Sequence, residues 1–226
     1  MTGFRGQVTL DGPSGTGKSS VARAVALELG AAYLDTGAMY RAATVAVLDA
    51  GVDLDDAHGI TRAVGEAAIG IGTDAATEQV TVDAVDVTDR IRGTEVTRAV
   101  SPVSAVPAVR RLLVDAQRSL VDGAPAVVVE GRDIGTVITP DAPLKIYLTA
   151  DERVRALRRH TDTASRSGGD LATVQASLAR RDAHDSTRTH APLMAADDAV
   201  VLDSTDLEIS QTVEAVLTLA AERGIR

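Results

Sequence analysis

The sequence predicts an α/β protein with a five-stranded parallel sheet flanked by helices. Apolar runs at residues 8–10, 126–129, 144–148 and 200–202 are short and rich in β-branched side chains. Such runs are typical of parallel strands buried on both faces. A brief fifth run, residues 32–34, completes the expected sheet. Helical periodicity separates these runs, and this alternation indicates a doubly wound core.

The helices of this core are predicted from apolar residues that recur at helical spacing. These segments are residues 21–29, 39–48, 109–120 and 209–220. The first helix should begin near Lys18, and Asp206 is the expected cap of the last. Thr36 is expected to cap the helix that follows the second strand.

Two segments interrupt the alternation of strands and helices. Residues 80–82 and 85–87 flank a turn at Asp83, so the region 69–88 is expected to form an inserted antiparallel hairpin. Residues 151–190 contain eight arginines against six acidic residues, together with a Ser-Gly-Gly break. That composition is typical of a mobile basic flap. The length of 226 residues favours one domain with one main sheet rather than two.

The composition excludes several classes of function. A net charge of −9 argues against a nucleic-acid or anionic-membrane surface, and 2% aromatic residues leave few platforms for stacked bases. No cysteine is present, so disulfides and thiolate sites are excluded, and the four histidines lack metal-ligand spacing. No leader or membrane-spanning run is evident. We therefore expect a cytoplasmic, monomeric protein whose partners are small molecules, with no nucleic-acid or membrane partner.

A phosphate-binding loop directly follows the first strand. Residues 12–19 read Gly-Pro-Ser-Gly-Thr-Gly-Lys-Ser, and glycines allow backbone N–H groups to approach an anion closely. Lys18 would supply charge to the outer phosphates, Ser19 would offer its hydroxyl to Mg²⁺, and the following helix would direct its positive dipole end to the same place. A tight strand-to-helix connection is the alternative interpretation. The residues expected to bind ATP are Gly12, Pro13, Ser14, Gly15, Thr16, Gly17, Lys18, Ser19 and Ser20.

Two further motifs follow strands of the expected sheet. Residues 35–41, Asp-Thr-Gly-Ala-Met-Tyr-Arg, open a helix and form a candidate second anion site, unless they are only a capped helix with a surface arginine. Glu130, which comes directly after a buried strand, could orient water on Mg²⁺, although Asp133 is the alternative for that role. Arg132 is a candidate for binding phosphate, and an Arg-Asp pair in a turn is the simpler explanation.

The basic flap holds two sets of charged residues at helical spacing. Each set would share one helix face and close over charged oxygens, or it would be a solvated surface. One set comprises Arg155, Arg158 and Arg159. The other set comprises Arg181, Asp185 and Arg188.

Taken together, these motifs resemble those of the bacterial cytidylate kinase family over essentially the whole chain. The resemblance rests on Asp-Gly-Pro-Ser-Gly-Thr-Gly-Lys-Ser at 11–19, Leu-Asp-Thr-Gly-Ala-Met-Tyr-Arg at 34–41, Glu-Gly-Arg-Asp-Ile-Gly-Thr at 130–136, Pro-Asp-Ala-Pro-Leu-Lys-Ile-Tyr-Leu at 140–148 and Arg-Arg-Asp-x-x-Asp-Ser-x-Arg at 180–188. It implies a single P-loop domain of the nucleoside monophosphate kinase type over residues 1–226. The core would span about 1–62, 102–150 and 190–226, the monophosphate-binding insertion about 63–101, and the lid with acceptor-site helices about 151–189.

The resemblance also implies a function and a role for each candidate residue. The function is ATP-dependent phosphorylation of CMP and dCMP to CDP and dCDP by direct in-line transfer, with Mg²⁺ as cofactor. The implied catalytic residues are Lys18, Arg132, Arg158 and Arg159. The implied acceptor site places Thr36, Arg41 and Arg132 around the phosphate with Tyr40 close by, Ser101, Arg110 and Asp133 at cytosine, Arg181 and Asp185 at the ribose, and Arg188 completing the site.

Departures from the family pattern occur at three positions. Thr36 stands where serine is frequent, Glu130 where aspartate is frequent, and Pro102 follows Ser101. The first two keep the hydroxyl and carboxylate chemistry. Related kinases with UMP or AMP as acceptor remain an alternative, as does an ATPase module that acts on a macromolecule. A guanine-reading GTPase is excluded because the chain contains no asparagine for its Asn-Lys-x-Asp motif.

Overall fold

The main sheet has five parallel strands in the order β2-β6-β1-β7-β8, as the sequence predicts. The computed structural model describes residues 5–167, 170–188 and 191–225. The strands are β1 (Gly6–Asp11), β2 (Ala32–Asp35), β6 (Ala126–Glu130), β7 (Leu144–Thr149) and β8 (Val200–Asp203). The centre of the sheet is buried because its side chains pack on both faces, as Val128 and Val129 of β6 do in separate core clusters.

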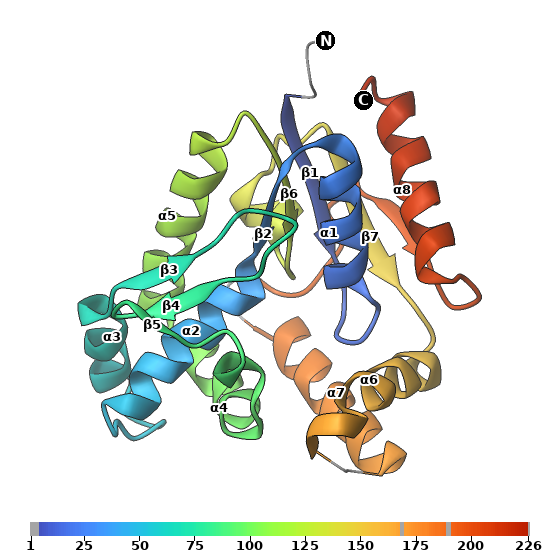
Figure 1. Cartoon of the computed structure of the whole chain (residues 1–226). Coiled ribbons are helices and arrows are strands. Elements are labelled where there is room, and N and C mark those ends of the chain that lie inside the picture. The colour runs from blue at the N-terminus through green and yellow to red at the C-terminus, as the bar shows by residue number, and fades with distance from the viewer. Residues whose placement is uncertain (1–4, 168–169, 189–190, 226) are drawn as a thin grey trace.

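Helices cover both faces of this sheet (Figure 1). Helices α1 (Lys18–Leu29) and α8 (Ile209–Glu222) share one core cluster with β1 and β7. On the other face, α2 (Thr36–Asp49) and α5 (Pro107–Gly123) pack against β2 and β6. The four predicted helices are therefore confirmed, with α1 beginning at Lys18 as expected.

Two predicted helix caps are wrong. The cap of α2 is Asp35, whose carboxylate accepts from the Ala38 N–H at 2.9 Å, while Thr36 is the first helical residue. The Thr36 hydroxyl instead donates to the Glu130 carbonyl at 2.8 Å, because β2 lies beside β6 in the sheet. The cap of α8 is Glu208 rather than Asp206.

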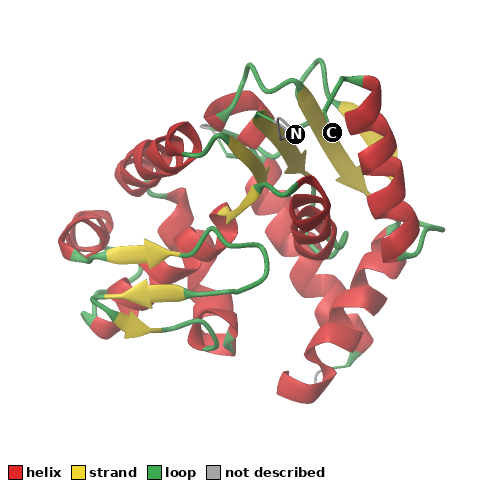
Figure 2. Cartoon of the chain, turned by 45° about the horizontal axis from the view of Figure 1, so that its top comes forward, coloured by secondary structure: helices red, strands yellow, loops and turns green. Residues whose placement is uncertain are grey.

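The insertion holds a small antiparallel sheet, as predicted, with three strands rather than the two of the expected hairpin (Figure 2). Strands β4 (Val80–Val82) and β5 (Val85–Asp86) pair around the turn at Asp83 as predicted, and β3 (Ile69–Ile71) adds a third antiparallel strand to β4. Helices α3 (Ala57–Glu66) and α4 (Thr94–Ala105) flank this sheet, with a short 3₁₀ turn at Arg90–Arg92. The valines of β4 are buried against α2, so the insertion is packed on the core.

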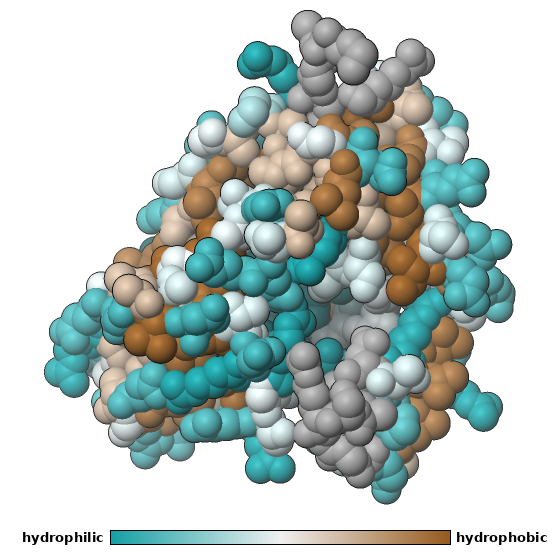
Figure 3. Space-filling view, in the orientation of Figure 1, coloured by the Kyte–Doolittle hydropathy of each residue, from teal (hydrophilic) through white to brown (hydrophobic). Residues whose placement is uncertain are grey.

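The basic segment forms two helices, α6 (Glu152–Ser167) and α7 (Leu171–Ser186), which pack against each other. Figure 1 places them beneath the carboxyl ends of the central strands, across from the insertion. Hydrophilic side chains gather around the hollow between these two parts (Figure 3). Helices α6 and α7 thus form one side of this hollow, and the candidate residues predicted from the sequence lie around it.

The turn from β1 into the phosphate-binding loop requires glycine. Gly12 has a φ of +143°, and a Cβ there would lie 2.0 Å from the Leu148 carbonyl oxygen of β7. The loop therefore leaves the sheet in tight contact with the neighbouring strand, and only a residue without a side chain allows that path.

Candidate active site

Three candidate segments meet at the carboxyl end of the sheet. Strand β6 lies between β2 and β1, with Glu130 in register with both Asp35 and Leu10. The motifs that follow these strands are therefore neighbours in space although they are separated along the chain. Ligands bind at this edge in open α/β sheets, so the arrangement favours a site here.

Lys18 lies within the phosphate-binding loop itself. Its Nζ donates to the Pro13 carbonyl at 2.6 Å and to the Thr16 hydroxyl at 3.3 Å, and the residue is buried. Burial, followed by repulsion from Arg132, lowers the pKa of Lys18 well below its usual value. An anion in the loop would relieve both effects, because it would supply opposite charge beside the ammonium group and the N-terminus of α1.

A buried carboxylate lies close to Lys18 and Ser19 of the loop. Glu130 is 4% exposed and accepts a hydrogen bond from the Tyr33 hydroxyl. Burial and the nearby Asp35 raise the pKa of Glu130 to about 7, while Lys18, Tyr33 and Ser19 oppose that rise. The carboxylates of Glu130 and Asp35, with the Ser19 hydroxyl, fit a Mg²⁺ ion beside the phosphate-binding loop. Mg²⁺ usually binds one or two carboxylates together with substrate phosphates. Sequence reasoning missed Asp35 and Tyr33 here.

Replacing Glu130 by glutamine should change how stability depends on pH. The pKa of Glu130 is higher in the folded state than its unfolded value of 4.5, so the protonated group stabilises the folded state fully below pH 4.5. This stabilisation is lost as the pH rises through about 7. We expect the variant and the wild type to be similarly stable at pH 5. At pH 8 the variant should be more stable than the wild type, by ~1.4 kcal/mol for each unit by which the folded-state pKa of Glu130 exceeds its unfolded value. Urea unfolding at both pH values tests this, and a stability difference that is the same at pH 5 and pH 8 would contradict it.

Asp11 fixes the segment that follows β6. Its carboxylate accepts from the Ile134 N–H at 2.9 Å and the Gly135 N–H at 2.8 Å, at the start of a single π-helical turn, Ile134–Ile138. Burial raises the pKa of Asp11 to about 6 against the effect of those two bonds. Asp11 thereby links the start of the phosphate-binding loop to the turn that directly follows Arg132 and Asp133. Sequence reasoning did not assign Asp11 a role, although its place directly before the loop was visible.

A group of arginines converges opposite the loop. Burial and neighbouring arginines lower the pKa of Arg41 to about 9 and that of Arg181 to about 10. Arg159 repels both of them, and Arg132 and Arg188 also repel Arg181. Arg41 donates to the Ile91 carbonyl at 2.8 Å and to the Thr97 hydroxyl at 3.1 Å, which fixes its position. Such a concentration of positive charge suits the binding of a phosphate group.

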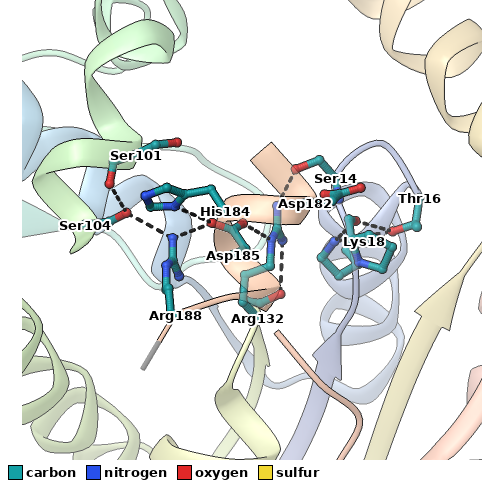
Figure 4. Close-up of polar contacts among 12 residues, drawn as sticks. Ser14, Thr16, Lys18, Ser101, Ser104, Arg132, Asp182, His184, Asp185 and Arg188 are labelled. Carbon is teal, nitrogen blue, oxygen red and sulfur yellow. Dashed lines mark hydrogen bonds and ion pairs between the residues drawn. The ribbon is translucent and has the colours of Figure 1, made fainter. Parts of the chain in front are cut away.

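Asp185 is the acidic centre among these arginines. It is 2% exposed and accepts from Arg132 Nε at 3.2 Å and from Arg188, one turn further along the chain. Arg188 also donates to the Ser104 hydroxyl at 3.1 Å, which in turn donates to the Ser101 carbonyl at 3.1 Å. Figure 4 shows this row of contacts running from Ser101 to the phosphate-binding loop. The structure thus connects α4 to α7 and to the turn after β6.

Arg110 and Asp133 form a buried ion pair, with an N–O distance of 2.5 Å and about 8% exposure of each side chain. The Arg110 guanidinium lies over the Tyr40 ring, 5.3 Å from its centroid. Burial raises the pKa of Asp133, and Arg110 and Arg188 oppose that rise. The pair presents a donor and an acceptor that are both positioned by the fold, which is suited to reading the edge of a planar base.

The two arginines expected to act together in the lid face different surroundings. Arg158 donates to the backbone carbonyls of Thr16, Ser204 and Leu207. Arg159 instead lies within electrostatic range of Arg41 and Arg181. Arg158 therefore joins α6 to the loop after β8, and Arg159 adds to the arginine group. Among the described residues, no three histidine or acidic side chains form a ready metal cluster, and no helix is long and apolar enough to cross a membrane.

This fold and site define a P-loop kinase. Solved structures with a similar fold include a gluconokinase from Sinorhizobium meliloti (17% identity, covering 97% of this chain and 94% of that one, TM-score 0.50) and a shikimate kinase from Bacteroides thetaiotaomicron (12% identity, covering 95% and 98%, TM-score 0.51). At these identities the likeness concerns the fold alone.

The chain belongs to the cytidylate kinase family, whose model matches residues 8–222. Its relatives include the cytidylate kinase of Rhodococcus opacus, 55% identical with 96% of this chain and 95% of that protein covered. The cytidylate kinase of Streptomyces avermitilis is 49% identical, with 96% and 93% covered. The family resemblance predicted from the sequence is confirmed.

Proposed function

We propose that the protein transfers the γ-phosphoryl group of ATP to CMP and dCMP, and so forms CDP and dCDP. The observation that carries this proposal is the juxtaposition of two charged sites across one hollow. One is the phosphate-binding loop with Lys18, and the other is the arginine group around Asp185 with the Arg110–Asp133 pair. Phosphoryl transfer depends chiefly on bringing two anionic substrates into line and offsetting their charge, which this arrangement supports.

The donor site would be formed by residues 12–20, with the β- and γ-phosphates on the backbone N–H groups and near Lys18. Ser19 and Glu130 would hold Mg²⁺, Glu130 through water, and Asp35 adds a second carboxylate beside Glu130. When bound, the ion would neutralise charge on the transferred group and orient the donor phosphates. Tyr33 keeps the Glu130 carboxylate in place by donating a hydrogen bond from its hydroxyl group.

The acceptor site would bind the monophosphate through three recognition elements. Thr36, Arg41 and Arg132 would surround its phosphate, with Tyr40 close by. At the base, Asp133 would accept from the exocyclic amino group of cytosine, while Arg110 and Ser101 would complete the hydrogen bonds. Arg181, Asp185 and Arg188 would reach the ribose side.

The chemical step needs no general base. At neutral pH an oxygen of the CMP phosphate is already ionised, so it attacks the γ-phosphorus directly while the bond to the β-phosphate oxygen breaks. Lys18 and Arg132 would offset charge as it moves between the two sites, and Arg159 of α6 would do the same. Closing α6 and α7 over the hollow would exclude water and limit hydrolysis of ATP. We propose that one chain suffices, because Arg132 joins the phosphate-binding loop to the arginine group within the same chain.

A panel of acceptors tests this function. The protein is mixed with Mg²⁺ and ATP, and ADP formation is measured with CMP, dCMP, UMP, AMP, GMP or no acceptor. Strong turnover with CMP and dCMP alone is the expected result. A preference for another monophosphate would reject the proposed base recognition, and equal ADP formation without acceptor would reject the kinase function. Light scattering on the same sample reports whether the active species is a monomer.

A further inference from the structure

Ser14 of the phosphate-binding loop is held by three different parts of the chain. Its backbone N–H donates to Asp182 Oδ1 of α7 at 3.0 Å, and its carbonyl accepts from Arg155 of α6 at 3.0 Å. Its hydroxyl accepts from Arg132 at 2.7 Å. Both polar groups of the Ser14 backbone are therefore satisfied by side chains of α6 and α7.

Arg155 and Asp182 are joined to each other as well as to Ser14. The Arg155 guanidinium donates to Asp182 Oδ2, and its Nε donates to the Ala150 carbonyl at 3.1 Å. Arg155 is 7% exposed, so this is a desolvated contact in which both partners are confined. Charge-assisted hydrogen bonds in such surroundings are stronger than those on a surface.

Close packing reinforces the contact. A Cβ on Gly15 would lie 2.8 Å from the Arg155 carbonyl oxygen and 3.2 Å from the Arg155 Cβ. The first turn of α6 thus lies directly on the loop at the residue after Ser14. A shift of α6 or α7 would have to change these contacts, because there is no free space between helix and loop to absorb it.

The charges explain why the two residues occur together. Asp182 is close enough to Lys18 to raise the pKa of its ammonium group, although burial lowers that pKa more strongly. An isolated carboxylate at this place would repel the phosphates of a nucleotide. Arg155 offsets the Asp182 charge, so the carboxylate can hold the loop without opposing the ligand.

We propose that Arg155 and Asp182 are a positioning pair that fixes the Ser14 peptide when α6 and α7 lie over the loop, and so makes ATP affinity depend on the position of these helices. The proposal rests on the proposed function in that ATP is the ligand of the loop. Neither side chain need touch the transferred group, because both act through the loop backbone. The pair is distinct from Asp185 of α7 and from Arg188, which follows that helix and bonds Asp185 (Figure 4).

Variants of the pair test this proposal through binding as well as activity. Asp182→Ala should weaken binding of a non-hydrolysable ATP analogue by ~10-fold, as expected for loss of a charge-assisted hydrogen bond to a partly buried donor. Calorimetry should show a change of less than about 2-fold for CMP, since no acceptor contact is removed. Asp182→Asn, which keeps an oxygen acceptor for the Ser14 N–H, should recover part of the ATP-analogue affinity.

Arg155→Gln should weaken ATP-analogue binding more than Asp182→Asn does, because it leaves the carboxylate beside the phosphates without a counter-charge. Adding Asp182→Asn to Arg155→Gln should then restore part of the lost affinity. Arg153→Gln is the matched control, since it removes the same charge from an exposed position two residues earlier on α6 and should leave both affinities unchanged. The corresponding kinetic result is a raised KM for ATP with little change in the KM for CMP.

Two results would overturn the proposal. One is an unchanged ATP-analogue affinity in the Asp182 variants, and the other is an equal loss of affinity for the ATP analogue and CMP, which a general loosening of the fold would produce. If Asp182→Ala does not fold, Asp182→Asn and the double variant decide. Binding of the ATP analogue is independent of the acceptor, so a wild-type chain that binds it but does not phosphorylate CMP overturns the proposed function alone.

Discussion

Replacing Lys18 by methionine should lower turnover with ATP and CMP by at least ~100-fold, the scale for removing one preorganised charge from a transition state. The Nζ lies at the loop that would hold the transferred phosphates, with its stem buried in the fold. Methionine fills a similar volume but carries no charge, so the loss reports the ammonium group. Steady-state kinetics with both substrates saturating measures the effect.

The chain provides its own control for this variant, because Lys145 is its only other lysine. Lys145 is also buried, and its Nζ binds both carboxylate oxygens of Asp198 at 2.9 Å. Lys145→Met should lower the free energy of unfolding and leave turnover near that of the wild type. Lys18→Met should instead lower turnover and raise the free energy of unfolding, because burial already disfavours the charged form of Lys18. Near-wild-type turnover in Lys18→Met would reject the role proposed for Lys18.

The core was predictable because its signals are local. A strand buried on both faces appears as a continuous apolar run, and β6 is the clearest case, with all five residues buried. The caps were less predictable, because Asp35 and Thr36 are adjacent oxygen-bearing residues that compete for one role. The choice between them depends on β6, whose Glu130 carbonyl accepts from Thr36 across 94 residues of sequence.

The same distinction applies to the site. The phosphate-binding loop is contiguous, so its spacing alone indicates its chemistry. Asp11, Tyr33 and Asp182 gain their roles only from contacts 123, 97 and 168 residues away along the chain. Arg158 and Arg159 are neighbours in sequence, yet one faces backbone carbonyls and the other the arginine group, because adjacent residues on a helix point in different directions.

Replacing Asp185 by asparagine should reduce kcat/KM for CMP by ~100-fold, since removing one member of a buried charged network leaves its partners uncompensated. Asparagine preserves the size of the side chain but removes the charge that holds Arg132 and Arg188 in place. Those two guanidinium groups would then repel each other in a poorly solvated site. The effect should fall on the acceptor, because the Asp185 carboxylate makes no direct contact with the phosphate-binding loop among the described residues.

The test of this prediction is the difference between the change in KM for CMP and the change in KM for ATP. The KM for CMP should rise strongly while the KM for ATP changes by less than about 3-fold, the range expected for a site without direct contact. Asp197→Asn, at an exposed position, removes the same charge and should leave both values unchanged. Equal increases in both KM values would instead mean that Asp185 supports the hollow as a whole. Arg132 bonds both Asp185 and the Ser14 hydroxyl, so the loss of Asp185 could then reach both sites through Arg132. That result would contradict an acceptor-specific role for Asp185.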